Sequence, residues 1–138
     1  MKLKTPLCDV LGIELPIIQA PMASATTPEL AAAVCQAGAL GSLGLAYTQP
    51  EAMMRDAERV RAMTKRPFNL NLFLSKSPEA IEAAAQNAAL DAIGPYFEEL
   101  GLKRPQPVKA PYSPDQEAQL EAIEQIRPAV FTFHFGDA

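Results

Sequence analysis

The chain has 138 residues, of which 49% are hydrophobic and 20% are charged, and its formal net charge is −4. These values are typical of one globular domain that can bury a core. The acidic balance, with no large basic cluster, argues against nucleic acid or an anionic membrane as the main partner. We also find no signal peptide and no run near the ~20 apolar residues of a membrane span, and therefore expect a cytoplasmic protein.

The first predicted elements are a strand and a helix. Residues 16–21 (PIIQAP) form a short β-rich run that is bounded by prolines. Residues 26–38 (TTPELAAAVCQAG) then predict a helix with Thr27 as its cap and Gly38 just past its end. Strand followed directly by helix is the first half of a parallel crossover unit.

The same order then repeats. Residues 39–44 (ALGSLG) predict a second buried strand, and residues 48–64 a second helix with Thr48 and Glu51 in capping-box register. Residues 68–73 (FNLNLF) alternate apolar and polar positions and predict a third strand.

The second half contains more helix and one further strand. An alanine-rich helical stretch begins at Ser77 and is expected to break at Gly94 and Pro95. After a proline-bearing connection, a helix capped by Ser113 leads to the sequence FTFHFG, the fourth predicted strand. Its alternation predicts that Phe131, Phe133 and Phe135 share one face and that Thr132 and His134 share the other. The repeated alternation of strands and helices predicts an α/β fold with about four parallel strands and right-handed crossovers.

Polar side chains recur toward the carboxyl ends of these strands. They are Gln19, Ser42, Asn71 and His134, the only histidine. Because parallel α/β folds build their sites at this edge, the four residues suggest a ligand pocket. Gln19 and Ser42 could equally satisfy neighbouring backbone groups. Asn71 and His134 are the stronger candidates, since strand interiors prefer apolar residues and a neutral imidazole can accept a proton, although a histidine in a core is the plainer alternative.

Two other motifs carry less information about function. The glycines of GALGSLG do not have the spacing of a dinucleotide or Walker motif, and we expect Gly41 and Gly44 to mark places of close approach. Cys8 and Cys35 lie too far from any second Cys or His to predict a disulfide framework or a metal site, so we expect buried free thiols.

Four stretches together resemble the nitronate monooxygenase family, formerly called 2-nitropropane dioxygenases. They are PIIQAPMAS, TTPELAAAVCQAGALGSLG, FNLNLF and FTFHFG, in the order and at the spacing of the family. The resemblance implies the N-terminal portion of a flavin-binding TIM-type (β/α)8 barrel, with residues 1–138 as its N-terminal half. A barrel of this type needs ~250 residues, so we expect it to be incomplete in this chain. We also expect the chain to self-associate, because uncovered phenylalanines favour association.

The resemblance also implies a cofactor and roles for particular residues. Ala20, Pro21 and Met22 would lie against FMN, and Asn71 matches an FMN-binding position. His134 matches the histidine beside the flavin, which removes a proton next to a nitro group or holds its oxygens. The segments that hold the FMN phosphate lie later in family members, outside these 138 residues.

The implied activity is FMN-dependent oxidation of alkyl nitronates and nitroalkanes by oxygen, with release of nitrite. The fragment alone is expected to be inactive. One alternative is an FMN-dependent enoyl reductase of the same superfamily, which has a similar N-terminal strand and glycine segment. Another is a complete, non-catalytic α/β domain that binds a small ligand.

Overall fold

The computed structural model describes residues 4–74 and 80–136. These residues form two compact units. The sheet unit consists of residues 4–74 and 114–136, and the helix unit consists of residues 80–113. The helix unit is thus an insertion in the sequence of the sheet unit.

The sheet unit contains a three-stranded parallel sheet in the order β1-β2-β3. Its strands are β1 (Gly41–Gly44), β2 (Phe68–Phe73) and β3 (Val130–His134). We expected about four strands, and the described residues contain three. The segment predicted as the first strand makes only one parallel bridge, between Ile18 and Leu40. Proline removes a donor and restricts the preceding residue, so the prolines at both ends of 16–21 leave room for little more than this bridge.

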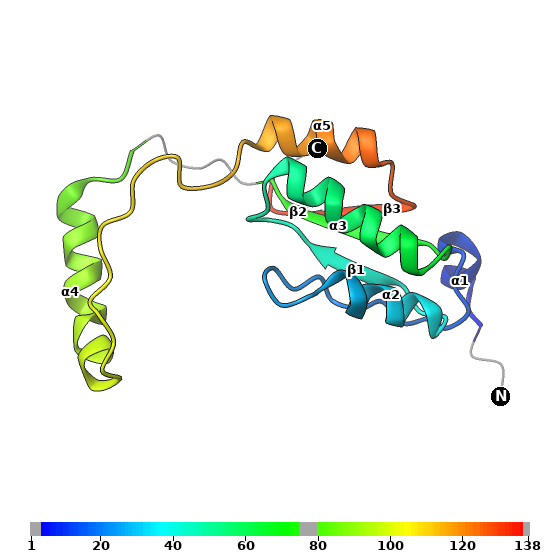
Figure 1. Ribbon diagram of the computed structural model, residues 1–138, viewed down its shortest axis with the longest axis horizontal. Coiled ribbons are helices and arrows are strands. Elements are labelled where there is room, and N and C mark those ends of the chain that lie inside the picture. Colours follow the sequence, from blue (N-terminus) through cyan, green and yellow to red (C-terminus); the bar gives the residue numbers. More distant parts are fainter. Residues whose placement is uncertain (1–3, 75–79, 137–138) are drawn as a thin grey trace. The chain divides into compact units, whose positions relative to one another are not determined.

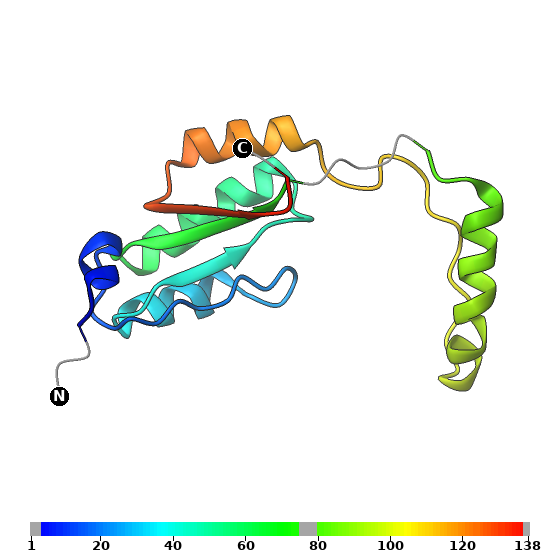
Figure 2. The same ribbon diagram turned by 180° about the vertical axis from the view of Figure 1, so that it is seen from behind.

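Three helices cover one face of this sheet: α2 (Pro28–Gln36), α3 (Pro50–Met63) and α5 (Gln116–Ile126). Figure 1 shows them with the strands behind, and Figure 2 shows the strands from the other side. A short helix, α1 (Pro6–Leu11), precedes them. The core between helices and sheet comprises apolar side chains that include Leu43, Met53, Val60, Leu70, Leu72 and Ile123. Leu70 and Leu72 lie on the helix-facing side of β2, as its alternation predicted.

The helix starts were predicted with mixed success. Thr27 caps α2 as expected, because its hydroxyl accepts a hydrogen bond from the Leu30 N–H at 3.2 Å. The capping box at Thr48 was wrong, since α3 begins at Pro50 without a side-chain cap. The cap of α5 is Asp115 rather than Ser113, and its carboxylate accepts from two backbone N–H groups. A carboxylate suits a helix start because it also meets the positive end of the helix dipole.

Gly41 and Gly44 confirm the expectation of close approach. A Cβ atom on Gly41 would lie 2.1 Å from the Ala31 carbonyl oxygen of α2, and one on Gly44 would lie 2.6 Å from the Ala23 nitrogen. Helix α2 therefore packs directly on β1, and the loop after residue 20 packs on the carboxyl end of the same strand. No side chain larger than hydrogen fits at either position without a backbone shift.

The helix unit has one helix, α4 (Ala83–Glu99), followed by an extended segment. The expected break at Gly94 and Pro95 was wrong, because α4 runs through both residues. The helical start predicted at Ser77 lies outside the described residues. Local contacts join the two parts of the unit: Arg104 pairs with Asp91, and the Ile81 N–H donates to the Tyr112 hydroxyl at 3.2 Å. Among the helices that the structure describes, none is long and apolar enough to cross a membrane.

Candidate functional site

A row of polar side chains crosses the face of the sheet that the three helices leave uncovered. It contains all four residues predicted from the strand ends, together with two more. In the order in which hydrogen bonds connect them, its residues are Gln19, Ser42, Asn69, Thr132, Asn71 and His134. We call this row the polar ladder. Because neighbouring strands are in parallel register, side chains from segments far apart in sequence lie next to one another here.

One end of the polar ladder is structural. The Gln19 side-chain amide donates to the Ser42 carbonyl and accepts from the Ser42 N–H, both at 3.3 Å. It also donates to the Thr26 hydroxyl at 3.3 Å. Gln19 thus takes the place of a backbone partner where the first predicted strand has ended. This is the structural alternative that the sequence had left open for Gln19.

The middle of the polar ladder is built from two buried asparagines on β2. Asn69 and Asn71 are each only 2% exposed. The Asn69 nitrogen donates to the Ser42 hydroxyl at 3.2 Å and to the Thr132 hydroxyl at 3.0 Å. The Asn71 nitrogen donates to the same Thr132 hydroxyl at 2.9 Å. Sequence reasoning had placed Asn69 and Thr132 on this face but had not selected them as site residues.

His134 ends the polar ladder and is exposed. Its Nδ1 atom lies 3.2 Å from the nitrogen and 3.3 Å from the oxygen of the Asn71 side-chain amide. Its ring packs edge-on against Phe73, with 5.8 Å between ring centroids. No described residue forms a hydrogen bond with Nε2, so this nitrogen is available to a substrate. The arrangement holds an imidazole by one nitrogen and leaves the other open, as proton transfer requires.

The strand carrying His134 ends there because the next residue changes conformation. Phe135 has φ 62° and Gly136 has φ 64°. The predicted shared face of three phenylalanines was therefore wrong for Phe135, whose ring turns to pack on Phe73 at 5.2 Å. A Cβ atom on Gly136 would lie 1.9 Å from the Leu74 carbonyl oxygen, so this turn presses against the end of β2.

The residues that the resemblance places against FMN lie at the same edge of the sheet. Ala20, Pro21 and Met22 follow the bridge at Ile18, and the Met22 N–H donates to the Thr26 hydroxyl at 3.3 Å. Ala20 and Met22 are exposed, and no described residue accepts from the Ala20 N–H. Beside this loop is a hollow of about 140 Å³, whose lining includes Ser24, Thr26, Gly44, Tyr47, Thr48 and Asp56.

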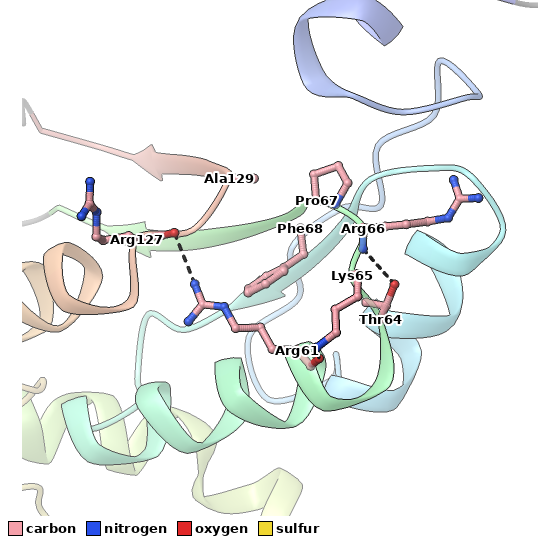
Figure 3. A pocket seen from close by; sticks show the side chains of 8 residues that line it. All are labelled: Arg61, Thr64, Lys65, Arg66, Pro67, Phe68, Arg127 and Ala129. Atoms are coloured by element: carbon pink, nitrogen blue, oxygen red, sulfur yellow. Dashed lines mark hydrogen bonds between the residues drawn. The ribbon is translucent and has the colours of Figure 1, made fainter.

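A second hollow, of about 520 Å³, lies at the opposite edge of the sheet and is rich in cations (Figure 3). Arg61 donates to the Arg127 carbonyl at 3.3 Å, and Lys65 donates to the Arg61 carbonyl at 3.1 Å. These cations thus bind the carbonyl ends of α5 and α3. The guanidinium groups of Arg66 and Arg127 point away from one another in Figure 3, and Arg66 pairs with Glu14. We therefore interpret this hollow as structural.

Both cysteines are buried and free, as predicted. The Cys35 thiol donates to the Pro67 carbonyl at 3.2 Å and accepts from the Gly41 N–H at 3.3 Å. Burial raises the pKa of the Cys35 thiol, which disfavours the reactive thiolate. Among the described residues, no group of three or more His, Cys, Asp or Glu side chains could hold a metal ion.

This geometry defines an α/β protein with a parallel sheet and a polar, histidine-bearing face at the carboxyl ends of its strands. The sequence profile of the nitronate monooxygenase family matches residues 4–138. The chain belongs to this family of enzymes. It is 40% identical to the nitronate monooxygenases of Paraburkholderia phytofirmans over 135 residues and of Pseudomonas aeruginosa over 129 residues. These matches cover 96% and 92% of the chain, but only 37% and 36% of the two relatives.

Solved structures agree with this assignment. The chain is similar to a nitroalkane oxidase from Streptomyces ansochromogenes, with a TM-score of 0.75 and 32% identity over 96% of the chain and 36% of that structure. It is also similar to FabK from Thermotoga maritima, with a TM-score of 0.65 and 26% identity over 96% of the chain and 31% of that structure. The chain thus spans about a third of the length of the proteins it matches.

Proposed function

We propose that the protein carrying this chain is a cytoplasmic, FMN-dependent enzyme that oxidises alkyl nitronates and nitroalkanes with oxygen and releases nitrite. The observation that carries the proposal is His134, held by Asn71 at Nδ1 and open at Nε2, in a chain of the nitronate monooxygenase family. The relatives' names and the nitroalkane oxidase structure support the substrate class.

The proposal includes the fold that surrounds this site. Residues 1–138 would form the N-terminal half of a flavin-binding (β/α)8 barrel, in which the polar ladder faces the interior. The exposed edge of β3 and the 41% exposure of Phe133 support further packing at this side, either by more chain or by self-association.

The residues present fit a flavin at the carboxyl edge of the sheet. Ala20 and Met22 are exposed and Pro21 is half-buried, and the Ala20 N–H has no partner among the described residues, so it can donate to a ring heteroatom. Gly44 leaves room for this loop to lie against β1. Asn71 would help to hold the flavin, and the FMN phosphate would be held by later segments of the protein. When bound, the flavin supplies the redox chemistry.

His134 has the role of proton acceptor in this proposal. A neutral nitroalkane must lose the proton on the carbon next to the nitro group before it can be oxidised as the nitronate, and Nε2 of His134 can take that proton. The protonated ring can then hold the nitro oxygens. A nitronate supplied already ionised needs only the second of these roles.

Substitution of the histidine separates the two roles. In the full-length protein, His134→Asn should lower kcat/KM for a neutral nitroalkane by about 10² to 10⁴, the usual contribution of a general base, and should affect the nitronate far less. Steady-state oxygen consumption with each substrate measures the difference. Equal losses on both substrates would contradict the role of proton acceptor.

The cofactor assignment is tested with a matched pair of asparagines. Asn71→Ala should weaken FMN binding by about 1 to 3 kcal/mol if one buried partner is lost. Asn87 is exposed on α4 in the helix unit, and Asn87→Ala is the control that should retain the flavin. Flavin fluorescence during titration of the apoprotein measures both. Unchanged affinity in Asn71→Ala would remove this residue from the cofactor site.

FMN-dependent enoyl reduction is the second candidate, and the similarity to FabK is the reason to test it. NADH oxidation with an enoyl thioester, without oxygen consumption on nitronate, would favour it. A full-length protein that binds no flavin would instead favour a non-catalytic ligand-binding domain.

A further inference from the structure

The Thr132 hydroxyl lies at the centre of the polar ladder and has all its hydrogen-bonding capacity in use. It accepts from the Asn69 nitrogen at 3.0 Å and from the Asn71 nitrogen at 2.9 Å. It donates its only proton to the Asn69 oxygen at 3.2 Å. A hydroxyl has one proton and two acceptor lone pairs, so these three bonds saturate it.

The saturated hydroxyl determines which way the Asn71 amide points. With its proton given to Asn69, Thr132 can only accept from Asn71, which keeps the amide nitrogen of Asn71 on the Thr132 side. The Asn71 oxygen is then left with one neighbour among the described residues that can donate to it, Nδ1 of His134 at 3.3 Å. Asn71 is 2% exposed, so water cannot readily replace that donor.

A buried amide oxygen without a donor is costly, and this decides between the two neutral forms of the imidazole. If the proton of His134 lies on Nδ1, it bonds the Asn71 oxygen, and the buried Asn71 amide has a partner for its oxygen as well as for its nitrogen. If it lies on Nε2, Nδ1 can accept from the Asn71 nitrogen, but the Asn71 oxygen has no partner.

We propose that Thr132 is a positioning residue that, through Asn71, keeps the proton of neutral His134 on Nδ1 and so leaves Nε2 unprotonated. The inference deepens the proposed function and rests on it for its meaning, since Nε2 must be unprotonated to accept a proton from the substrate. Free histidine prefers the opposite form, with the proton on Nε2. The polar ladder therefore imposes the form that proton abstraction needs.

The test uses this chain, in which His134 is the only histidine. Labelling histidine with ¹⁵N gives one pair of ring-nitrogen signals, and their shifts show which nitrogen is protonated at a pH where the ring is neutral. The wild-type chain should show a protonated Nδ1 and an unprotonated Nε2. The wild-type spectrum is decisive by itself: a protonated Nε2 overturns the proposal.

Variants then test the part played by Thr132. Thr132→Val removes the hydroxyl at nearly constant shape and should return the proton to Nε2, whereas Thr132→Ser keeps the hydroxyl and should keep the wild-type form. Thr64→Val is the matched control. The Thr64 hydroxyl accepts a hydrogen bond from the Arg66 N–H before β2 begins, outside the polar ladder, so this variant should leave the imidazole signals unchanged. Wild-type signals in Thr132→Val would overturn the role of Thr132, and so would signals in Thr132→Ser that match those of Thr132→Val.

Activity provides a second measurement. In the full-length protein, Thr132→Val should lower kcat/KM for a neutral nitroalkane about tenfold or more, with a much smaller loss on the ionised nitronate and rescue by Thr132→Ser. Equal loss on the two substrates would contradict the inference. The ring-nitrogen spectrum does not depend on flavin or turnover. A protonated Nε2 in the spectrum, together with the expected selective loss of nitroalkane activity in His134→Asn, would refute this inference alone. Absence of nitroalkane activity in the full-length protein would refute the proposed function.

Discussion

The sheet unit and the helix unit are both built from apolar and alanine-rich sequence, but they use it differently. In the sheet unit, Leu70 and Val60 are 0% exposed and belong to one core shared by the strands and three helices. In the helix unit, Gly94 is the only buried residue of α4, while Ile93 and Tyr96 are 41% and 65% exposed. Composition alone does not distinguish the two units.

This difference in burial indicates that most of the stability of the chain comes from the sheet unit. Burial of apolar area is the main favourable term in folding, and an isolated helix of α4's 17 residues is only marginally stable in water. We therefore expect the sheet unit to resist opening far more than the helix unit does. Identical substitutions in the two units should have different effects, and in one case effects of opposite sign.

The largest difference is expected from shortening an apolar side chain. Leu70→Ala should destabilise the sheet unit by about 2 to 5 kcal/mol, because it removes a fully buried side chain and leaves a cavity. Ile93→Ala in α4 should cost less than about 1 kcal/mol, since the side chain is already partly in water. Urea denaturation, followed by native-state hydrogen exchange for each unit, measures both effects. Comparable losses would show that Ile93 is buried against something in solution.

Replacement of glycine by alanine should change sign between the units. Gly41→Ala forces a Cβ atom against the Ala31 carbonyl and should destabilise the sheet unit by about 1 to 3 kcal/mol. At Gly94 a Cβ atom meets nothing within 4 Å, so Gly94→Ala should stabilise α4 by up to about 1 kcal/mol through helix propensity. Hydrogen exchange of α4 amides should become slower in Gly94→Ala without a change in β2. Destabilisation of α4 by Gly94→Ala would mean that other atoms pack against Gly94 in solution.

The smallest effect is a pH dependence confined to the sheet unit. The pKa of the Cys35 thiol is raised in the folded state by burial, so the unfolded state releases this proton first as pH increases. The contribution of the Cys35 thiol to the free energy of unfolding is fully present below the ordinary thiol pKa of about 8.5. It is lost as pH rises above this value, by at most about 1.4 kcal/mol per pH unit.

Cys35→Ser isolates this contribution, because serine can bond the Pro67 carbonyl and the Gly41 N–H but does not titrate. Above the thiol pKa, the free energy of unfolding of the wild type, measured by thermal unfolding, should decrease as pH rises. In Cys35→Ser it should decrease less steeply with pH. The difference in slope between the wild type and Cys35→Ser is the quantity that decides. Parallel slopes would remove Cys35 from the pH dependence.

Much of the sheet unit could be predicted from the sequence, because local patterns and tertiary packing agree there. The alternation in FNLNLF correctly assigned the faces of β2, and Gly41 and Gly44 were correctly interpreted as points of close approach. Four of the six residues of the polar ladder were selected from the sequence. The pattern of polar residue types at strand ends identified Asn71 and His134 as the stronger candidates, but their connection through Thr132 depends on the register of β2 and β3, which no local pattern encodes.

The errors fall where local rules compete with tertiary structure. A strand was expected over residues 16–21, but its prolines limit pairing and Gln19 completes the hydrogen bonds with its side chain. A break was expected at Pro95, but α4 continues through it. At Phe135 the alternation continues in the sequence while the backbone has already left the strand, since a positive φ at a phenylalanine has no composition signal.

The polar ladder also constrains the order of events when the protein is made. Asn69 and Asn71 leave the ribosome before Thr132, which follows them by 63 and 61 residues. Until β3 arrives, both amides face the sheet edge without their main partner, and the helix unit must be synthesised before the partner exists. Residues 4–74 can therefore collapse around α2 and α3 early, but the two amides must stay hydrated. Of the three described strands, β3 is thus the one whose synthesis supplies the hydrogen-bond partners of both asparagines and brings His134 beside Asn71.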